Sequence, residues 1–181
     1  MAELVVLADD NGRPIGTADK ATVHTSDTPL HLAFSAYLVD DHGRTLLTRR
    51  ALTKKTWPGV WTNSFCGHPG PGEANEHAVY RRALDELGIP ESAIADVTEV
   101  LPDFSYRAVD SSGIVEHEIC PVFLVRLADI EAVSSNPAEV DSHRWVDAND
   151  LIAASELVPD VFSPWLVWEL AEQPLRDAFK R

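Results

Sequence analysis

The sequence predicts an α+β fold with a mostly β body, one central helix and one C-terminal helix. Three observations support this: short apolar segments bounded by turn residues, one long run with helical spacing, and a helix-capping pair near the C-terminus. The chain has 181 residues, of which 45% are hydrophobic, enough for a core without disulfides. We therefore expect a single domain over residues 1–181.

The first half of the chain predicts strands separated by turns. Asp10-Asn11-Gly12 and the stretch 40–43 are typical turn sequences, and proline and glycine bracket a further short extended segment. The predicted strands are Leu4 to Ala8, His31 to Val39, Thr45 to Arg49 and the short segment Trp61 to Cys66.

The pattern changes to helix from Glu73 to Leu87. Apolar residues recur at helical spacing, as at Val79 and Ala83, and Gly88 ends the run with Pro90 beyond it. This segment predicts the central helix.

The second half predicts further strands and then helix. The strand candidates are Val97 to Ala108, Ile114 to Leu127 and the short Arg144 to Val146, which leads into a small helix near Asp150. Ser163 is a good N-cap and Pro164 suits the first helical position, so a last helix begins there.

Charge and composition exclude several classes of protein. The net charge of −14, from 15 basic and 29 acidic residues, disfavours nucleic-acid binding and contact with an anionic membrane. The acidic N-terminus does not resemble a signal peptide, and the apolar runs are too short to span a bilayer. Two cysteines make no disulfide framework, so we expect a cytoplasmic protein. An anionic substrate would need a local basic cluster or metal ions.

Two short extended segments place reactive side chains on a common face. Cys66 and His68 are two residues apart, as are Glu116 and Glu118, and alternate residues of a strand share a face. An isolated pair of glutamates is usually a solvated strand face. Here strongly apolar residues follow, which predicts a half-buried strand where two carboxylates repel unless a cation lies between them.

Candidate metal ligands lie in these two segments and in a short stretch nearer the N-terminus that contains His24 and His31. Three imidazoles and two carboxylates suit a divalent transition metal with higher coordination than structural zinc; they belong to His24, His31, His68, Glu116 and Glu118. Each histidine taken alone is more often a surface residue, and spacing does not show that the five converge.

A positive run, residues 48–55, stands out in this acidic chain. It offers a pocket for phosphate groups, to which Arg81 and Arg82 could add. The alternative is a solvated loop, with the two arginines in ordinary helical ion pairs to Asp85 and Glu86.

The segment from Gly67 to Ile89 resembles the Nudix signature. The leading Gly67, then Glu73, Arg81, Glu86 and Gly88 fit the pattern of that loop–helix–loop motif. Arg82 stands where the family has a glutamate, which puts ordinary diphosphate hydrolysis in doubt. Glu86 could still help to bind one Mg²⁺ on a diphosphate.

Motifs over most of the chain resemble a more specific family, the type 1 isopentenyl diphosphate isomerases. Thr62 to Pro69 resembles its TNSxCGHP motif. The other matching segments are His24-Thr25, Leu30 to Ser35, Thr48 to Ala51, Trp57 to Trp61, Tyr106 to Ala108, Glu116 to Phe123 and Phe162 to Trp165.

This resemblance implies a Nudix-type α/β/α sandwich with a mixed sheet. It also implies an enzyme that reversibly converts isopentenyl diphosphate to dimethylallyl diphosphate, the two five-carbon isoprenoid precursors, by adding and removing a proton. The partner is then a small allylic or homoallylic diphosphate, and the chain a monomer or weak dimer without nucleic-acid or membrane partners.

The resemblance also implies roles for individual residues. Cys66 matches the catalytic thiol, and Glu118 with Tyr106 matches its acid–base partner. The ligands of one divalent metal, Mn²⁺, Zn²⁺ or Fe²⁺, match His24, His31, His68, Glu116 and Glu118. A second site, where Mg²⁺ arrives with the diphosphate, matches Glu86 and the backbone at Cys66. The substrate-binding residues match Lys20, Arg50, Lys54, Arg82 and Trp165, the last facing a developing cation.

Two other functions are weighed against this one. A Nudix diphosphate hydrolase would release phosphate, against which Arg82 argues, and a non-catalytic metal-binding domain would not need Cys66. Cys120, beside Pro121 in an apolar strand, is expected to be a small core residue.

Overall fold

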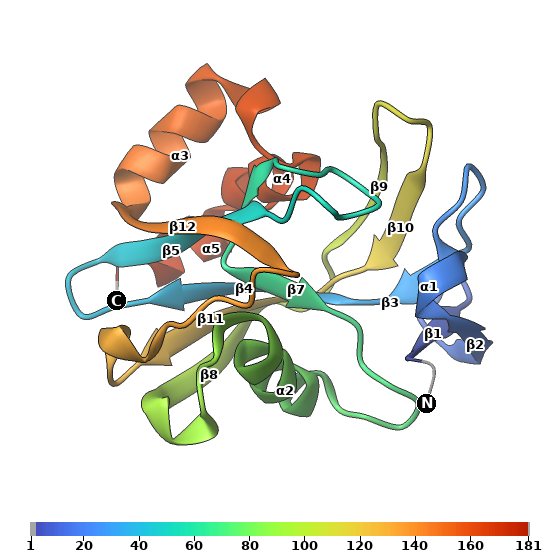
Figure 1. The fold of residues 1–181 in the computed structure, drawn as a ribbon, viewed down its shortest axis with the longest axis horizontal. Helices are drawn as coiled ribbons and strands as arrows, with labels where there is room; N and C mark the ends of the chain where they lie inside the picture. The colour runs from blue at the N-terminus through green and yellow to red at the C-terminus, as the bar shows by residue number, and fades with distance from the viewer. Residues whose placement is uncertain (1–2, 181) are drawn as a thin grey trace.

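Two β-sheets organise the chain in the computed structural model, which describes residues 3–180 (Figure 1). The first sheet has the order β2-β1-β3-β10-β9, and the second has β12-β5-β4-β11-β8, with β6 paired to β5 and β7 to β4. The strands of the first sheet are β1 (Leu4–Ala8), β2 (Pro14–Asp19), β3 (His31–Leu32), β9 (Ser105–Val109) and β10 (Val115–Ile119). Those of the second are β4 (Phe34–Val39), β5 (Arg44–Arg50), β6 (Trp61–Thr62), β7 (Phe65–Gly67), β8 (Ile94–Leu101), β11 (Val122–Leu127) and β12 (Val140–Asp147).

Three segments that we predicted as single strands are each divided between the two sheets. His31 to Val39 breaks at Ala33, Val97 to Ala108 breaks between β8 and β9, and Ile114 to Leu127 breaks at Cys120-Pro121. Pro121 has no N–H to continue a ladder, which explains the last break. The prediction was wrong on continuity because an apolar run does not show which sheet a strand joins.

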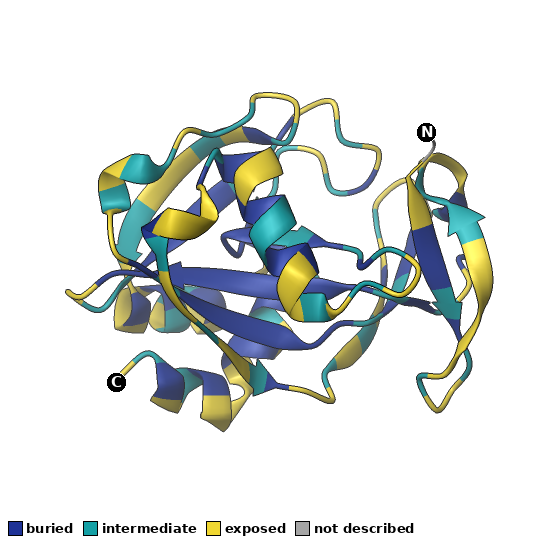
Figure 2. Ribbon diagram, turned by 90° about the horizontal axis from the view of Figure 1, so that it is seen from below, coloured by how far each residue is buried: buried dark blue, intermediate teal, exposed yellow. Residues whose placement is uncertain are grey.

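The second sheet is covered on both faces, which confirms the predicted α/β/α layers. Along β4, Phe34, Ala36 and Leu38 pack toward α2 (Asn75–Leu87), whereas Tyr37 and Val39 pack toward the C-terminal helices. Because alternate residues of a strand face opposite sides, a strand buried on both faces is apolar throughout. Figure 1 shows α2 on one side of this sheet, and Figure 2 shows the central strands buried and the outer helix faces exposed.

The C-terminal layer consists of α3 (Ala148–Leu157), α4 (Pro164–Ala171) and α5 (Gln173–Ala178). As predicted, the Ser163 hydroxyl accepts from the N–H of Leu166 and Pro164 opens α4. Sequence patterning missed α5, the short helix α1 (Lys20–Val23) and the largely exposed strand β2. None of the helices in residues 3–180 has the length and apolar character that a bilayer crossing requires.

The central helix begins two residues later than predicted. Glu73 precedes the helix and accepts hydrogen bonds from the N–H of Gly70 and from the Arg81 side chain. These bonds connect the loop before α2 to the middle of the helix. Gly88 ends the helix in the left-handed region at φ 66°, as its sequence position predicted.

Replacing Gly88 with alanine should destabilise the fold. The new Cβ would lie 2.8 Å from the carbonyl oxygen of Ser134 in a left-handed backbone, so we expect a loss of about 2–4 kcal/mol in the free energy of unfolding. Gly43→Ala is the matched control, because Gly43 has φ 77° and open space around its Cβ position. Equal losses in urea denaturation of the two variants would contradict the packing at Ser134.

Candidate active site

A cavity of about 550 Å³ lies where the two sheets meet. Every residue that the isomerase resemblance assigned to the site lines it except His31, whose side chain is fully buried. The lining residues among them are Lys20, His24, Arg50, Lys54, Cys66, His68, Arg82, Glu86, Tyr106, Glu116, Glu118 and Trp165. Arg81, which could have added to the phosphate pocket, is not among the lining residues and pairs with Glu73.

The register of the first sheet places Glu118 between two partners. On β10 it pairs with His31 of β3 on one side and with Tyr106 of β9 on the other. Its Oε1 lies 3.4 Å from His31 Nε2 and 3.0 Å from His68 Nε2, and Tyr106 donates to Oε2 at 2.8 Å. Strand pairing thus fixes two of these three contacts, and the segment after β7 supplies the third.

Glu116 lies two residues earlier on the same face of β10, as predicted. His24 Nε2 is 3.0 Å from its Oε2, and the Thr56 hydroxyl donates to Oε1 at 2.6 Å. Each carboxylate therefore has an imidazole on one side and a hydroxyl donor on the other.

The histidines and Glu118 have the chemistry and spacing of a metal site. Ligand atoms of His24, His31, His68 and Glu118 all lie within 4.8 Å of one another. The buried Nε2 atoms of His24 and His31 lie 3.0 and 3.4 Å from oxygens of Glu116 and Glu118, respectively. Three imidazoles and a carboxylate aimed at one point suit a divalent transition metal, and Glu116 lies beside them. Four of the five predicted ligands therefore lie together, and metal binding by the set stays a prediction.

Burial and charge shift the pKa values of this cluster in different directions. Burial acts to raise the pKa of Glu118, but hydrogen bonds from His31 and His68 outweigh it and hold that pKa well below its usual range. Burial lowers the pKa of His68. Burial and the neighbouring carboxylates raise the pKa of Tyr106 well above its ordinary value, so its hydroxyl stays protonated.

The thiol of Cys66 contacts Ser35 on β4 and Asn63, which lies between β6 and β7. Cys66 on β7 pairs with Ser35 on β4, and the Ser35 hydroxyl is 3.6 Å from its sulfur. The amide of Asn63 donates to the sulfur at 3.2 Å, and its oxygen accepts from Thr62 and from the indole of Trp165. Burial raises the pKa of the Cys66 thiol to about 12, against the opposing effect of Ser35 and Asn63.

Trp165 lines one wall of the cavity together with a second aromatic ring and a guanidinium group. It stacks on Tyr106 with ring centroids 5.7 Å apart, and the Arg50 guanidinium lies 5.5 Å from its ring centroid. Trp57 packs edge-on against it. The indole N–H donates to Asn63 Oδ1, so this hydrogen bond and the stacking on Tyr106 together fix the orientation of the ring.

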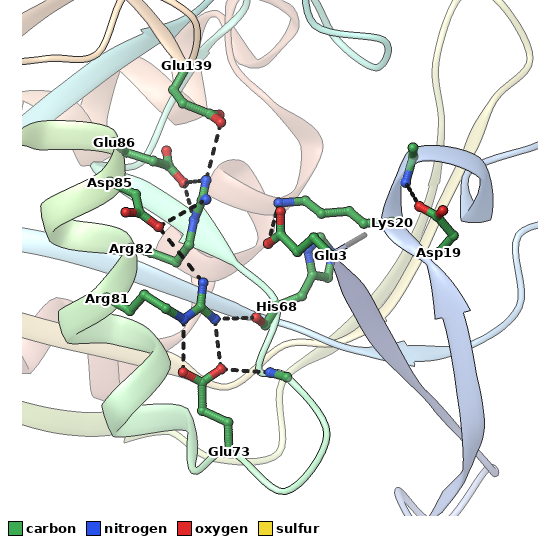
Figure 3. A network of polar contacts seen from close by, with 12 residues as sticks. Glu3, Asp19, Lys20, His68, Glu73, Arg81, Arg82, Asp85, Glu86 and Glu139 are labelled. Atoms are coloured by element: carbon green, nitrogen blue, oxygen red, sulfur yellow. Dashed lines mark hydrogen bonds and ion pairs between the residues drawn. The ribbon is translucent and has the colours of Figure 1, made fainter. Parts of the chain in front are cut away.

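Three of the four predicted phosphate-binding cations are already paired with carboxylates, whereas Arg50 donates to the carbonyl oxygen and the hydroxyl of Thr56. Lys20 contacts Glu3 at 2.9 Å, and Arg82 contacts Glu86 at 2.6 Å and Glu139 at 3.5 Å (Figure 3). Lys54 contacts Glu139 as well. Burial raises the pKa of Glu86, and Arg82 opposes that rise. The predicted ion pair of Arg82 with Glu86 is confirmed, and both residues line the cavity. Phosphate binding by Arg82 stays a prediction.

Several functional neighbours were not predicted from the sequence. Glu3, Thr56 and Glu139 contact predicted site residues but lie outside the matching segments, with no motif to mark them. Ser35 ends the matching segment Leu30 to Ser35 and contacts Cys66. Asn63 stands inside the matching segment Thr62 to Pro69, and its position there was the available signal. Cys120 is buried as expected, with its sulfur 3.5 Å from the Ser35 hydroxyl.

Divalent metal should stabilise the purified protein. At a concentration a hundred times the dissociation constant, one bound ion adds about 2.7 kcal/mol to the free energy of unfolding. We expect chelator-treated protein to melt at a higher temperature after addition of Mn²⁺ or Zn²⁺. The variant His31→Ala should lose most of this shift, whereas His42→Ala, in an exposed turn, should keep it. Equal shifts in both variants would contradict the site.

The fully buried Glu169 of α4 should give stability a distinctive pH dependence. Burial raises its pKa to about 8, so between about pH 5 and 8 the folded carboxyl keeps a proton that the unfolded chain has released. Its contribution to stability is complete at low pH and is lost as pH rises, by at most about 1.4 kcal/mol per pH unit.

The variant Glu169→Gln removes this titration. Its free energy of unfolding, compared with that of the wild type, should therefore rise from pH 5 to pH 8. Parallel pH profiles of the two proteins in urea denaturation would contradict a neutral buried carboxyl.

Comparison with known proteins agrees with this geometry. The NUDIX domain model matches residues 29–166. A Corynebacterium glutamicum protein named isopentenyl-diphosphate Delta-isomerase is 59% identical over 97% of this chain and 93% of its own length. A Paenarthrobacter aurescens protein of the same name is 58% identical over 91% of this chain and 86% of its own.

Solved structures support the fold. A crystal structure from Deinococcus radiodurans superposes with a TM-score of 0.72 at 17% identity, covering 93% of this chain and 98% of that one. A MutT NUDIX hydrolase from Burkholderia pseudomallei gives a TM-score of 0.59 at 22% identity, covering 80% and 98%. The sequence matches add what the fold alone does not: this chain belongs to the NUDIX domain family and, within it, to the isopentenyl-diphosphate Delta-isomerases.

Proposed function

We propose that this protein is a metal-dependent enzyme that reversibly isomerises isopentenyl diphosphate to dimethylallyl diphosphate in isoprenoid precursor biosynthesis. The name of its curated relatives supports this activity. The observation that carries it is one cavity lined by a thiol, a carboxylate–tyrosine pair and a cluster of cations.

The reaction requires a proton donor and a proton acceptor around an unactivated alkene. Protonation at C4 leaves a tertiary carbocation at C3, and loss of a proton from C2 completes the shift of the double bond. A weakly basic alkene needs its acid in a pocket that excludes water. Cys66 and Glu118, on different strands of the cavity, serve as the two groups, with the protonated Tyr106 hydroxyl beside Glu118.

The aromatic wall suits the carbocation. Trp165 is 2% exposed, lines the cavity and stacks on Tyr106, so one ring face can stabilise positive charge away from water. Its indole N–H is bound to Asn63, which also binds Cys66, so the ring and the thiol are positioned by one amide.

Two groups of residues would hold divalent ions. The first comprises His24, His31, His68, Glu116 and Glu118, for Mn²⁺, Zn²⁺ or Fe²⁺, and the second comprises Glu86 with the backbone of Cys66, for Mg²⁺ bound with the diphosphate. When bound, such ions would offset the charge of the carboxylates and the diphosphate and tune the acidity of Glu118.

The diphosphate is held by Lys20, Arg50, Lys54 and Arg82. Glu3 and Glu139 neutralise three of these cations in the free protein, so substrate binding exchanges carboxylate contacts for phosphate contacts. This arrangement explains how a chain of net charge −14 receives an anion. We further propose a cytoplasmic monomer or weak dimer without nucleic-acid or membrane partners.

Removing either catalytic group should abolish turnover in a folded protein. We expect Cys66→Ala and Glu118→Gln each to lower kcat by at least about 10³-fold, because each removes one of the two proton-transfer groups. Dimethylallyl diphosphate formation, followed by ¹H NMR with Mg²⁺ and Mn²⁺ present, measures this.

Cys120→Ala and the exposed Glu99→Gln are the matched controls and should retain activity. Near-native turnover in Cys66→Ala or Glu118→Gln would contradict the role given to that residue. Release of phosphate by the wild type, seen by ³¹P NMR, would favour the hydrolase alternative.

A further inference from the structure

Acidic and basic side chains are almost balanced on the wall of the cavity. Among residues 3–180, five lysines and arginines line it against six aspartates and glutamates. A wall of this composition has no excess of positive charge with which to attract a diphosphate by itself. The acidic members of the wall therefore need an explanation.

Two of the six acidic residues have no part in the mechanism above. Three of the others are proposed metal ligands, and Asp19 caps the start of α1. The remaining two each contact a predicted phosphate-binding cation: Glu3 contacts Lys20, and Glu139 contacts Arg82 (Figure 3). Both carboxylates thus lie where the phosphate groups of a substrate are expected.

Glu139 lies between the two segments that supply the basic side chains. Its carboxylate contacts Lys54 of the positive run, and its Oε1 lies 3.5 Å from Nη2 of Arg82 on α2. Its carbonyl oxygen accepts from the N–H of Ala51, and its N–H donates to the carbonyl oxygen of Asn136, whose own N–H donates to the last turn of α2. The carboxylate therefore reaches both cations from a backbone that is bonded on both sides.

An anion that enters without a metal ion must compete with this carboxylate. Free phosphate and free diphosphate carry several negative charges, so Glu139 repels them at the place where Lys54 and Arg82 attract them. A divalent ion on the diphosphate offsets part of that charge and is itself attracted to carboxylate oxygens. Glu139 therefore opposes a metal-free anion more strongly than a metal–diphosphate complex.

We propose that Glu139 is a specificity-determining residue, which makes the anion site select a diphosphate that carries a divalent ion over phosphate and diphosphate without one. This inference deepens the proposed isomerase function and rests on it for the natural anion. Glu139 acts on binding through Lys54 and Arg82 and takes no part in proton transfer.

Calorimetric titration with inorganic pyrophosphate tests this selectivity on the full chain. Chelator-treated wild type and Glu139→Gln are each titrated once without and once with Mg²⁺. The amide keeps the size of the side chain and removes its charge, so Glu139→Gln should bind metal-free pyrophosphate at least about tenfold more tightly than the wild type. Its affinity for the Mg²⁺ complex should change by less than about threefold.

Glu131→Gln is the matched control, because Glu131 is exposed and does not line the cavity. It should leave both dissociation constants unchanged. An unchanged ratio of the two constants in Glu139→Gln would overturn the inference, whether both affinities rise, both fall or neither moves. So would a wild type that binds metal-free pyrophosphate as tightly as its Mg²⁺ complex. Glu139→Ala is measured in the same way if the amide variant does not fold.

The two proposals fail in distinguishable ways. A wild type that does not isomerise isopentenyl diphosphate contradicts the proposed function, and the pyrophosphate titration still decides the role of Glu139, because binding does not depend on turnover. An active wild type with an unchanged ratio in Glu139→Gln contradicts only the role given to Glu139.

Discussion

The hydrogen-bonded carboxylate of Glu118 is the interaction on which the site depends. Strand pairing places His31 and Tyr106 on either side of it, and His68 approaches from the second sheet. A carboxylate buried in this way is stable only with such donors or a cation around it. The same contacts that make its burial possible also bring the proposed metal ligands and the proposed acid–base group together.

The division of strands between two sheets makes this convergence possible. The chain leaves the first sheet for the second at Ala33 and again at Cys120-Pro121, so β3 and β10 stay side by side while β4 and β11 continue into the core. The first sheet then carries His31, Tyr106 and both glutamates, and the second carries Cys66 and, through α2, Arg82 and Glu86. Both the proposed proton-transfer groups and the basic side chains line the cavity between the two sheets.

Sequence patterning predicted what depends on local spacing. It identified β1, β5, α2 and the start of α4, because apolar period, glycine and capping residues act over a few positions. It failed on the division of His31 to Val39 and Ile114 to Leu127, since apolar runs look alike in either sheet. The resemblance to the isomerase family indicated the ligand set, which spacing alone left open. Glu139 and Glu169 had no such signal, because their roles arise from tertiary contacts with Arg82 and Tyr37.

The central claim, that this cavity protonates an alkene and leaves the diphosphate intact, is tested most directly by isotope labelling. Isopentenyl diphosphate is given to the protein in D₂O, with and without Mg²⁺ and Mn²⁺, and the product is examined by ¹H, ²H and ³¹P NMR. Dimethylallyl diphosphate with deuterium in a new methyl group, formed only with metal present and with both phosphates retained, is the predicted result. Product without solvent deuterium, or cleavage of the diphosphate, would contradict the account.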